Sequence, residues 1–248
     1  MRLRTLFAAA SLSALAACGG GGGGSSTPPP PPPTYANTSS PFYMPVHAGN
    51  TWTFTTGSKM ADAGPGTIVC SCTLNGTPYE RVDLFDPTGA YGSSFLFTKY
   101  NDAGNGGVLT TALVGTSTDR GNTISPFSAR MPVMNDAPVQ GYTYNLNGGT
   151  STITAAGQVQ TLANGQQIRS VADDTVSAPP VQNVSFGFAQ GVGVTMVGVG
   201  SSTTQISSFS IDAANSTAVV RAPQTVQHPV VTQPVEPSSI VPLLSKLF

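Results

Sequence analysis

The sequence predicts an all-β protein built on a curved antiparallel sheet. Only 8% of its 248 residues are charged, so the lysines and glutamates that usually line the exposed faces of helices are scarce. Apolar and polar residues alternate with a period of two in short runs, and turn sequences separate these runs, as in half-buried strands. We expect the sheet to form a half-barrel, a barrel or a sandwich, flanked by a disordered N-terminal linker and a disordered C-terminal tail.

The predicted strands lie between residues 42 and 213, the range assigned to the β-rich domain. Asn75-Gly76 and Asn164-Gly165 give strong hairpin signals between them, and Asp86-Pro87-Thr88-Gly89 gives another turn. The strands are expected at 51–55, 67–74, 79–84, 94–100, 108–114, 141–146, 151–155, 158–162, 167–171, 183–188, 192–199 and 205–211.

Residues 1–17 have the features of a bacterial export signal. Arg2 and Arg4 provide a positive start, residues 6–15 are mostly apolar, and two alanines follow. The apolar stretch is too short to remain in the membrane as a spanning helix. We therefore expect the signal to be removed.

The sequence Leu15-Ala16-Ala17-Cys18 resembles the lipobox of bacterial lipoproteins. In that family the cysteine sulfur receives a diacylglycerol, the signal is cut before the cysteine, and the new N-terminus is acylated, for example with palmitate. The resemblance implies a lipidated Cys18 and a stable membrane anchor. Aspartate after the cysteine favours the inner membrane in this family, so Gly19 implies the outer membrane of a Gram-negative envelope. The alternative is an ordinary cleaved signal in which Cys18 is incidental.

A spacer, residues 18–41, follows the signal. After the cysteine it contains six glycines and then, at residues 28–33, six prolines. Glycine runs form flexible coils, whereas a proline run of this length forms a semi-rigid rod of roughly 19 Å. The spacer would hold the β-rich domain away from the membrane surface.

The tail, residues 214–248, contains prolines that favour an extended or disordered chain. Its last residues differ, because their apolar side chains recur at helical spacing. This short amphipathic helix either docks on its own domain or stays disordered, and a peptide that docks on a partner or a membrane is the alternative. The apolar residues are Ile240, Leu243, Leu244, Leu247 and Phe248.

The domain begins with residues 45–54, Pro-Val-His-Ala-Gly-Asn-Thr-Trp-Thr-Phe, and Gly191-Val192-Gly193-Val194 lies near its end, before the last expected strand. These two sequences resemble the beginning and end of a group of uncharacterised bacterial lipoprotein domains. The resemblance implies a mainly antiparallel β architecture, such as a curved half-barrel similar to the lipoprotein carrier folds. It implies no known activity.

Cys70 and Cys72 are the cysteines that remain if Cys18 carries lipid. An exported protein meets an oxidising compartment, which favours a disulfide. On one extended strand their Cα atoms would lie roughly 6.6 Å apart, so a bond between them would need a kink. The alternatives are two buried thiols, a soft-metal site or a redox site.

We expect no metal ion and no cofactor. The chain has two histidines, His47 in the domain and His228 in the tail, which are too few for a histidine-rich site. Asp102, with Asn105 and Gly106 after it, lacks the bidentate glutamate of a calcium loop, and we expect a turn there.

The sequence also predicts a protein without enzymatic activity. His47 lacks a G-x-S-x-G elbow that would present a nucleophile to it. Asp83 and Asp86 are neighbours in sequence, whereas glycosidases need two carboxyl groups facing each other across a cleft. We expect Asp173 and Asp174 to lie in a solvated turn.

Three classes of function remain. The first is an envelope lipoprotein that presents a non-catalytic β-domain for structural or protein-binding work. The second is a carrier of a lipid or other hydrophobic ligand in the concave face of the sheet, and the third is a hydrolase. The formal net charge is −1 without a basic block, which excludes nucleic acid as an expected partner. An apolar pocket for the second class would be lined by Trp52, Phe54, Phe95, Phe97, Phe186 and Phe188.

Overall fold

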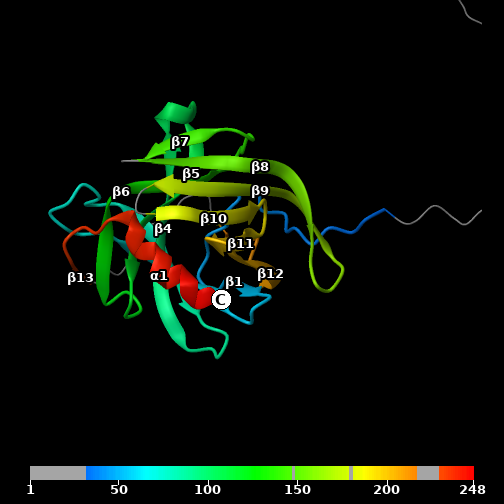
Figure 1. The fold of residues 1–248 in the computed structure, drawn as a ribbon, viewed down its shortest axis with the longest axis horizontal. Coiled ribbons are helices and arrows are strands. Elements are labelled where there is room, and N and C mark those ends of the chain that lie inside the picture. The colour runs from blue at the N-terminus through cyan, green and yellow to red at the C-terminus, as the bar shows by residue number, and fades with distance from the viewer. Residues whose placement is uncertain (1–31, 147–148, 179–180, 217–228) are drawn as a thin grey trace, which may run out of the picture. The chain divides into compact units, whose positions relative to one another are not determined.

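The computed structural model describes residues 32–146, 149–178, 181–216 and 229–248. The chain divides into residues 1–32 and a compact unit of residues 33–248. A single sheet of 13 strands runs through this unit, and β13 and β7 lie at its two ends (Figure 1). The predicted all-β fold on an antiparallel sheet is confirmed, and the sheet is open.

Twelve strands form two meanders of six, which are joined in the middle by pairing between β1 and β12. Chain neighbours within each meander pair antiparallel, as expected of strands connected by short turns. The strands are β1 Thr51–Phe54, β2 Lys59–Thr67, β3 Pro78–Phe85, β4 Tyr91–Asp102, β5 Val108–Ser117, β6 Thr123–Asn135, β7 Thr143–Leu146, β8 Gly149–Thr161, β9 Gln167–Ala178, β10 Val181–Ala189, β11 Gly193–Val199, β12 Ser202–Ser210 and β13 Val230–Val231.

The sheet is strongly curved, so that β6 approaches β7, β8 and β9 from the other end of the strand order. Register shifts occur in most of the strand pairs, and such bulges bend and twist a sheet. We call the concave side the inner face. Pairing of Trp52 with Met60, and of Met60 with Leu84, shows how side chains from successive strands meet on this face.

Two strand predictions are wrong for identifiable reasons. Residues 68–77 form a loop, and the strand before it is β2, whose sequence KMADAGPGT lacks apolar alternation. β2 is a strand because it pairs antiparallel with β1 on one side and with β3 on the other. The sequence did not predict β6 because it contains Pro126 and Pro132. Both prolines pair next to register shifts, where a missing N–H is tolerated.

The predicted strands 151–155 and 158–162 are parts of one long strand, β8. Three register shifts against β9 interrupt its alternation, which explains why the sequence divides it into two.

The described part of the tail lies on the domain, so the terminal helix follows the expected alternative in which it docks on its own domain. β13 pairs in parallel with β6, the edge strand of the first meander. The chain then enters the concave side as a 3₁₀ turn η2 (Pro237–Ile240), the helix α1 (Val241–Leu244) and a second turn η3 (Ser245–Leu247). We call residues 237–248 the terminal segment.

Among the residues that the structure describes, no helix has the length and apolar character needed to cross a bilayer.

Candidate functional site

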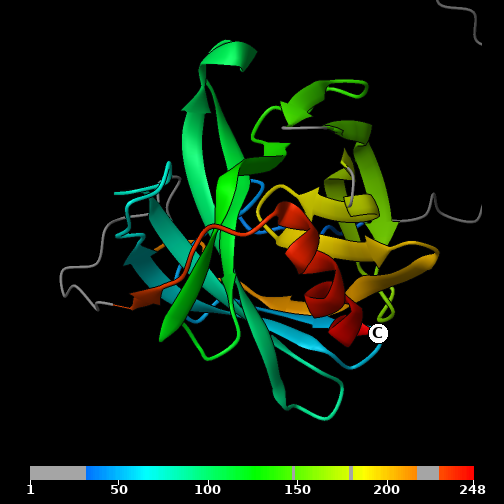
Figure 2. The same cartoon turned by 60° about the vertical axis from the view of Figure 1, so that its left-hand side comes forward.

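The terminal segment occupies the inner face of the sheet. In Figure 2 the terminal segment is the red helical ribbon, and in it η2 contacts β6, α1 contacts β11 and η3 contacts β3. Ile240, Leu244 and Leu247 are fully buried, and they belong to the same hydrophobic core as the strands. The periodicity of the sequence therefore identified the buried side of this segment. Leu243 is only partly buried, and 37% of the surface of Phe248 remains exposed.

The six aromatic residues predicted to line a pocket all belong to this core. Their exposed fractions lie between 0 and 2%, and the terminal segment packs in the same cluster. A ligand bound to this face would have to take the place of the terminal segment. The residues are Trp52, Phe54, Phe95, Phe97, Phe186 and Phe188.

Hydrogen bonds fasten the end of the terminal segment to the sheet. The hydroxyl groups of Thr56 and Ser58 donate to the carbonyl oxygen of Leu247, at 2.8 and 2.9 Å. Lys246 Nζ donates to the carbonyl oxygen of Gly92 at 2.9 Å. The first two bonds satisfy the carbonyl group of Leu247 at the end of the terminal segment, where no donor is available within the segment itself.

Residues 45–54 and residues 191–194 meet in the core. The indole Nε1–H of Trp52 donates to the carbonyl oxygen of Val192 at 2.6 Å. Gly193 has a φ of +93°, and a Cβ atom there would lie only 3.0 Å from the Trp52 ring. Asn50 accepts a hydrogen bond from the Asp212 amide at 2.9 Å. These residues hold the centre of the sheet together, where the two meanders join.

A buried pair of acidic side chains, Asp62 and Glu80, lies on the neighbouring strands β2 and β3. Asp62 accepts backbone hydrogen bonds from His47 at 3.0 Å and Gly64 at 2.9 Å, and it is hydrogen-bonded to Glu80. Burial, followed by the hydrogen bond and charge of Asp62, raises the pKa of Glu80 from 4.5 to about 9. Burial also raises the pKa of Asp62. The pair therefore retains a proton at neutral pH.

We expect this proton to make the stability of the fold depend on pH. Between pH 4.5 and about 9 the folded protein holds a proton on Glu80 that the unfolded chain releases. The contribution of Glu80 to the free energy of unfolding should therefore be fully present below pH 4.5 and be lost as the pH rises to about 9, by roughly 1 kcal/mol per pH unit. Urea unfolding of Glu80→Gln should show a clearly smaller slope against pH. The exposed Glu236→Gln is the control, and an equal slope in both variants would contradict the prediction.

Asp173 and Asp174 lie within β9, so the prediction of a solvated turn is wrong. Asp174 is completely buried on the inner side, and the Ser151 hydroxyl is 2.8 Å from both carboxyl oxygens. Burial raises the pKa of Asp174 well above its ordinary value. Asn135 Nδ2 donates to the Tyr144 hydroxyl at 2.8 Å in the same region. The side chains of Asp174, Ser151, Asn135 and Tyr144 are enclosed by the fold, and we interpret their hydrogen bonds as a buried polar network of the core.

Lys99 is another buried ionisable group. Its Nζ atom lies 3.7 Å from Asp136 Oδ2 and 5.0 Å from the centre of the Phe42 ring. Burial lowers the pKa of Lys99 to about 8, although the charge of Asp136 acts in the opposite direction. Phe95, Phe97 and Lys99 follow one another at a spacing of two. In a strand this spacing puts Lys99 on the same side as the two buried phenylalanines, so the sequence could have predicted its burial.

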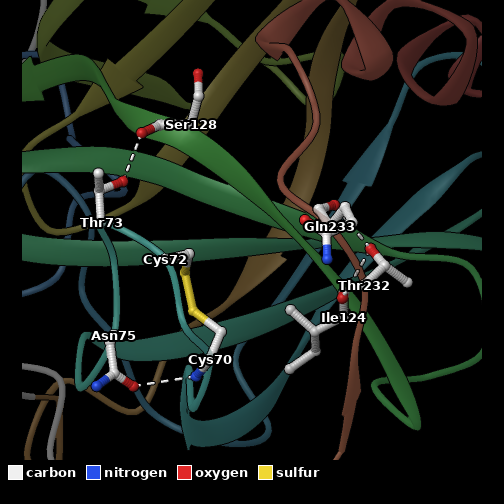
Figure 3. The surroundings of a disulfide bond; sticks show 8 residues. All are labelled: Cys70, Cys72, Thr73, Asn75, Ile124, Ser128, Thr232 and Gln233. Carbon is white, nitrogen blue, oxygen red and sulfur yellow. Dashed lines mark hydrogen bonds between the residues drawn. A yellow bond between two sulfur atoms is a disulfide. The ribbon is translucent and has the colours of Figure 1, made fainter.

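Cys70 and Cys72 are joined by a disulfide, with their Cα atoms 5.3 Å apart (Figure 3). The kink that the sequence required is present, because both cysteines lie in the loop after β2 and not on a strand. Both side chains are partly exposed.

The other candidate residues do not form a reactive cluster. His47 Nε2 lies 3.5 Å from Asp212 Oδ2 at the surface. Asp102 accepts a hydrogen bond from the Gly104 amide at 3.0 Å and caps the short turn η1 (Ala103–Asn105). Within the described ranges, no group of three or more His, Cys, Asp and Glu side chains is suited to hold a metal ion. Cys18 and His228 lie outside the described residues.

Comparisons of the chain with protein-family models, curated proteins and solved structures found no significant match.

Proposed function

We propose that the protein is an envelope lipoprotein, anchored in the outer membrane through Cys18, that presents a non-catalytic β-domain for structural or protein-binding work. The lipobox and the glycine and proline spacer support the anchor and the distance from the membrane. The observation that carries the presenting role is the terminal segment, which fills the inner face with the protein's own side chains. The outer surface of the domain then remains for contacts with an envelope partner.

The positions of the acidic groups support a function without catalysis. Glu80 is 3% exposed, and Asp174 is completely buried. A general acid or base must reach the proton that it transfers, directly or through one water molecule. Both acids instead bond to neighbouring parts of the fold. We assign them to the core and propose no reaction for them.

The anchor is tested by expressing the full chain in a Gram-negative host with radiolabelled palmitate. The wild-type protein should carry label and fractionate with the outer membrane. Cys18→Ser should lose both the label and the membrane association, because no acyl chain can be attached to serine by this route. Cys70→Ser is the matched control and should stay labelled. Label that persists in Cys18→Ser would overturn the proposed anchor.

The terminal segment also favours a second candidate function, a carrier of a hydrophobic ligand. An apolar helix of the chain's own sequence lies on the face where the aromatic residues gather. A long acyl chain has a similar apolar character and would take the place of Ile240, Leu244 and Leu247. The two functions differ in whether the terminal segment leaves the inner face when a lipid is offered.

A further inference from the structure

The disulfide between Cys70 and Cys72 lies beside an open groove on the surface of the domain. The groove has a volume of about 690 Å³ and lies next to the tail segment that carries β13 (Figure 3). Val69 and Ser71, which flank the cysteines, are exposed. The lining is polar or weakly apolar and carries no charge; it consists of Cys70, Ser71, Cys72, Thr73, Asn75, Ser128 and Pro234.

Backbone hydrogen bonds hold the loop around the disulfide. The Ile68 amide donates to the Thr77 carbonyl at 3.0 Å, and the Gly76 amide donates to the Ile68 carbonyl at 2.8 Å. Ile68 and Leu74 are both buried in the core. These backbone hydrogen bonds close the two ends of the loop, and the packing of Ile68 and Leu74 holds it against the core, through contacts that do not involve the sulfur atoms.

Side-chain hydrogen bonds fix the part of the loop that carries the cysteines. Asn75 Oδ1 accepts a hydrogen bond from the Cys70 amide at 3.0 Å. The Thr73 hydroxyl donates to the Ser128 carbonyl at 2.6 Å and so ties the loop to β6 (Figure 3). Both contacts hold the disulfide at the wall of the groove.

The disulfide adds little to the stability of such a loop. It encloses a single residue, Ser71, and the loss of chain entropy on cross-linking is smallest for the shortest loops. A cross-link that the fold does not need, held at an accessible surface, fits the labile and catalytic class of disulfides better than the structural class.

From these observations we propose that Cys70 and Cys72 form a thiol–disulfide exchange site that oxidises thiols of other molecules in the envelope. The uncharged lining suits an extended peptide segment bearing cysteine, or a small thiol, since neither would need a compensating charge. This activity is separate from the presenting role of the domain and does not depend on the state of the terminal segment.

The reaction balances without a further oxidant. A thiolate of the substrate attacks one sulfur atom of the disulfide, so a mixed disulfide forms and the other cysteine leaves as a thiolate that takes up a proton. A second substrate thiolate then attacks the substrate sulfur of the mixed disulfide. This releases the substrate disulfide and the reduced Cys70–Cys72 pair, and two electrons pass from two substrate thiols to the protein.

The test uses the full chain in detergent with excess reduced glutathione as the probe thiol. Alkylation and mass spectrometry follow the Cys70–Cys72 pair, while oxidised glutathione is quantified. We expect one oxidised glutathione per protein, at a rate within about tenfold of that for the same protein unfolded in urea. The variants Cys70→Ser and Cys72→Ser should each trap a glutathione mixed disulfide when mixed with oxidised glutathione. Ser71→Ala is the control and should react as the wild type.

The thermal stability of the reduced protein distinguishes a thiol–disulfide exchange site from a structural cross-link. Reduction, or the double replacement of Cys70 and Cys72 by serine, should shift the thermal unfolding midpoint by no more than about 2 °C, the shift of a small surface effect. The proposal is overturned if the native disulfide resists glutathione until the protein unfolds. A large fall of the midpoint on reduction would also overturn it, because the bond would then be structural.

Discussion

Replacing Leu244 with alanine should lower the free energy of unfolding by about 3–5 kcal/mol. Leu244 is fully buried on the inner face, in one core with the aromatic residues of the strands. Its replacement removes apolar contacts and leaves a cavity that the curved sheet cannot easily close, because the ladders on both sides fix its shape. Urea unfolding followed by the fluorescence of Trp52, the single tryptophan of the chain, would measure this loss.

Phe248→Ala is the matched control, because it removes a larger apolar side chain from the same segment. Phe248 is 37% exposed, so its loss should have a smaller effect, of about 1 kcal/mol. If both variants unfold at the wild-type urea concentration, the terminal segment does not belong to the core.

The second large effect is expected at Gly193, where alanine should lower the free energy of unfolding by about 3 kcal/mol. The φ of +93° strains any residue with a Cβ atom, and that atom would lie 3.0 Å from the buried Trp52 ring. The ring has little freedom to move, because its Nε1–H is bonded to Val192. Urea unfolding provides the measurement here as well.

Gly200→Ala separates backbone strain from the close contact. Gly200 also has a positive φ, +61°, but a Cβ atom there meets nothing within 4 Å. We expect this variant to lose about 1 kcal/mol, the cost of the strained backbone alone. Equal losses at Gly193 and Gly200 would mean that packing against Trp52 contributes nothing.

Local patterns were sufficient to predict the fold class and most strands. Alternation and turn sequences mark β3, β4 and β10 to β12 correctly because each pairs with a neighbour through a hairpin. β2 and β6 were not predicted, because β2 lacks apolar alternation and β6 contains Pro126 and Pro132. The ladders with their neighbouring strands, which the residue pattern of each segment does not show, hold both in the extended conformation.

The buried charges show where reasoning from the sequence reached its limit. Single charged residues are usually solvated, so Asp174 was expected at the surface. Its position at the inward spacing of two, between Ala172 and Val176, was the signal that it lies inside. The pairing of Asp62 with Glu80 depends on the register of β2 against β3, which the sequence alone does not give. Likewise, helical spacing identified the buried side chains of the terminal segment, but only the curved sheet shows where they dock.

Hydrogen exchange of the terminal segment, with and without a long-chain lipid, tests most directly whether the domain presents its surface or carries a ligand. Mass spectrometry would follow peptides covering residues 240–247 in the full chain, with β3 as a protected reference and the turn at 86–89 as an exposed one. If the domain presents its surface, residues 240–247 should exchange slowly, and oleate or phospholipid should leave that rate unchanged. Lipid binding that accelerates exchange in residues 240–247 while β3 stays protected would contradict the presenting role.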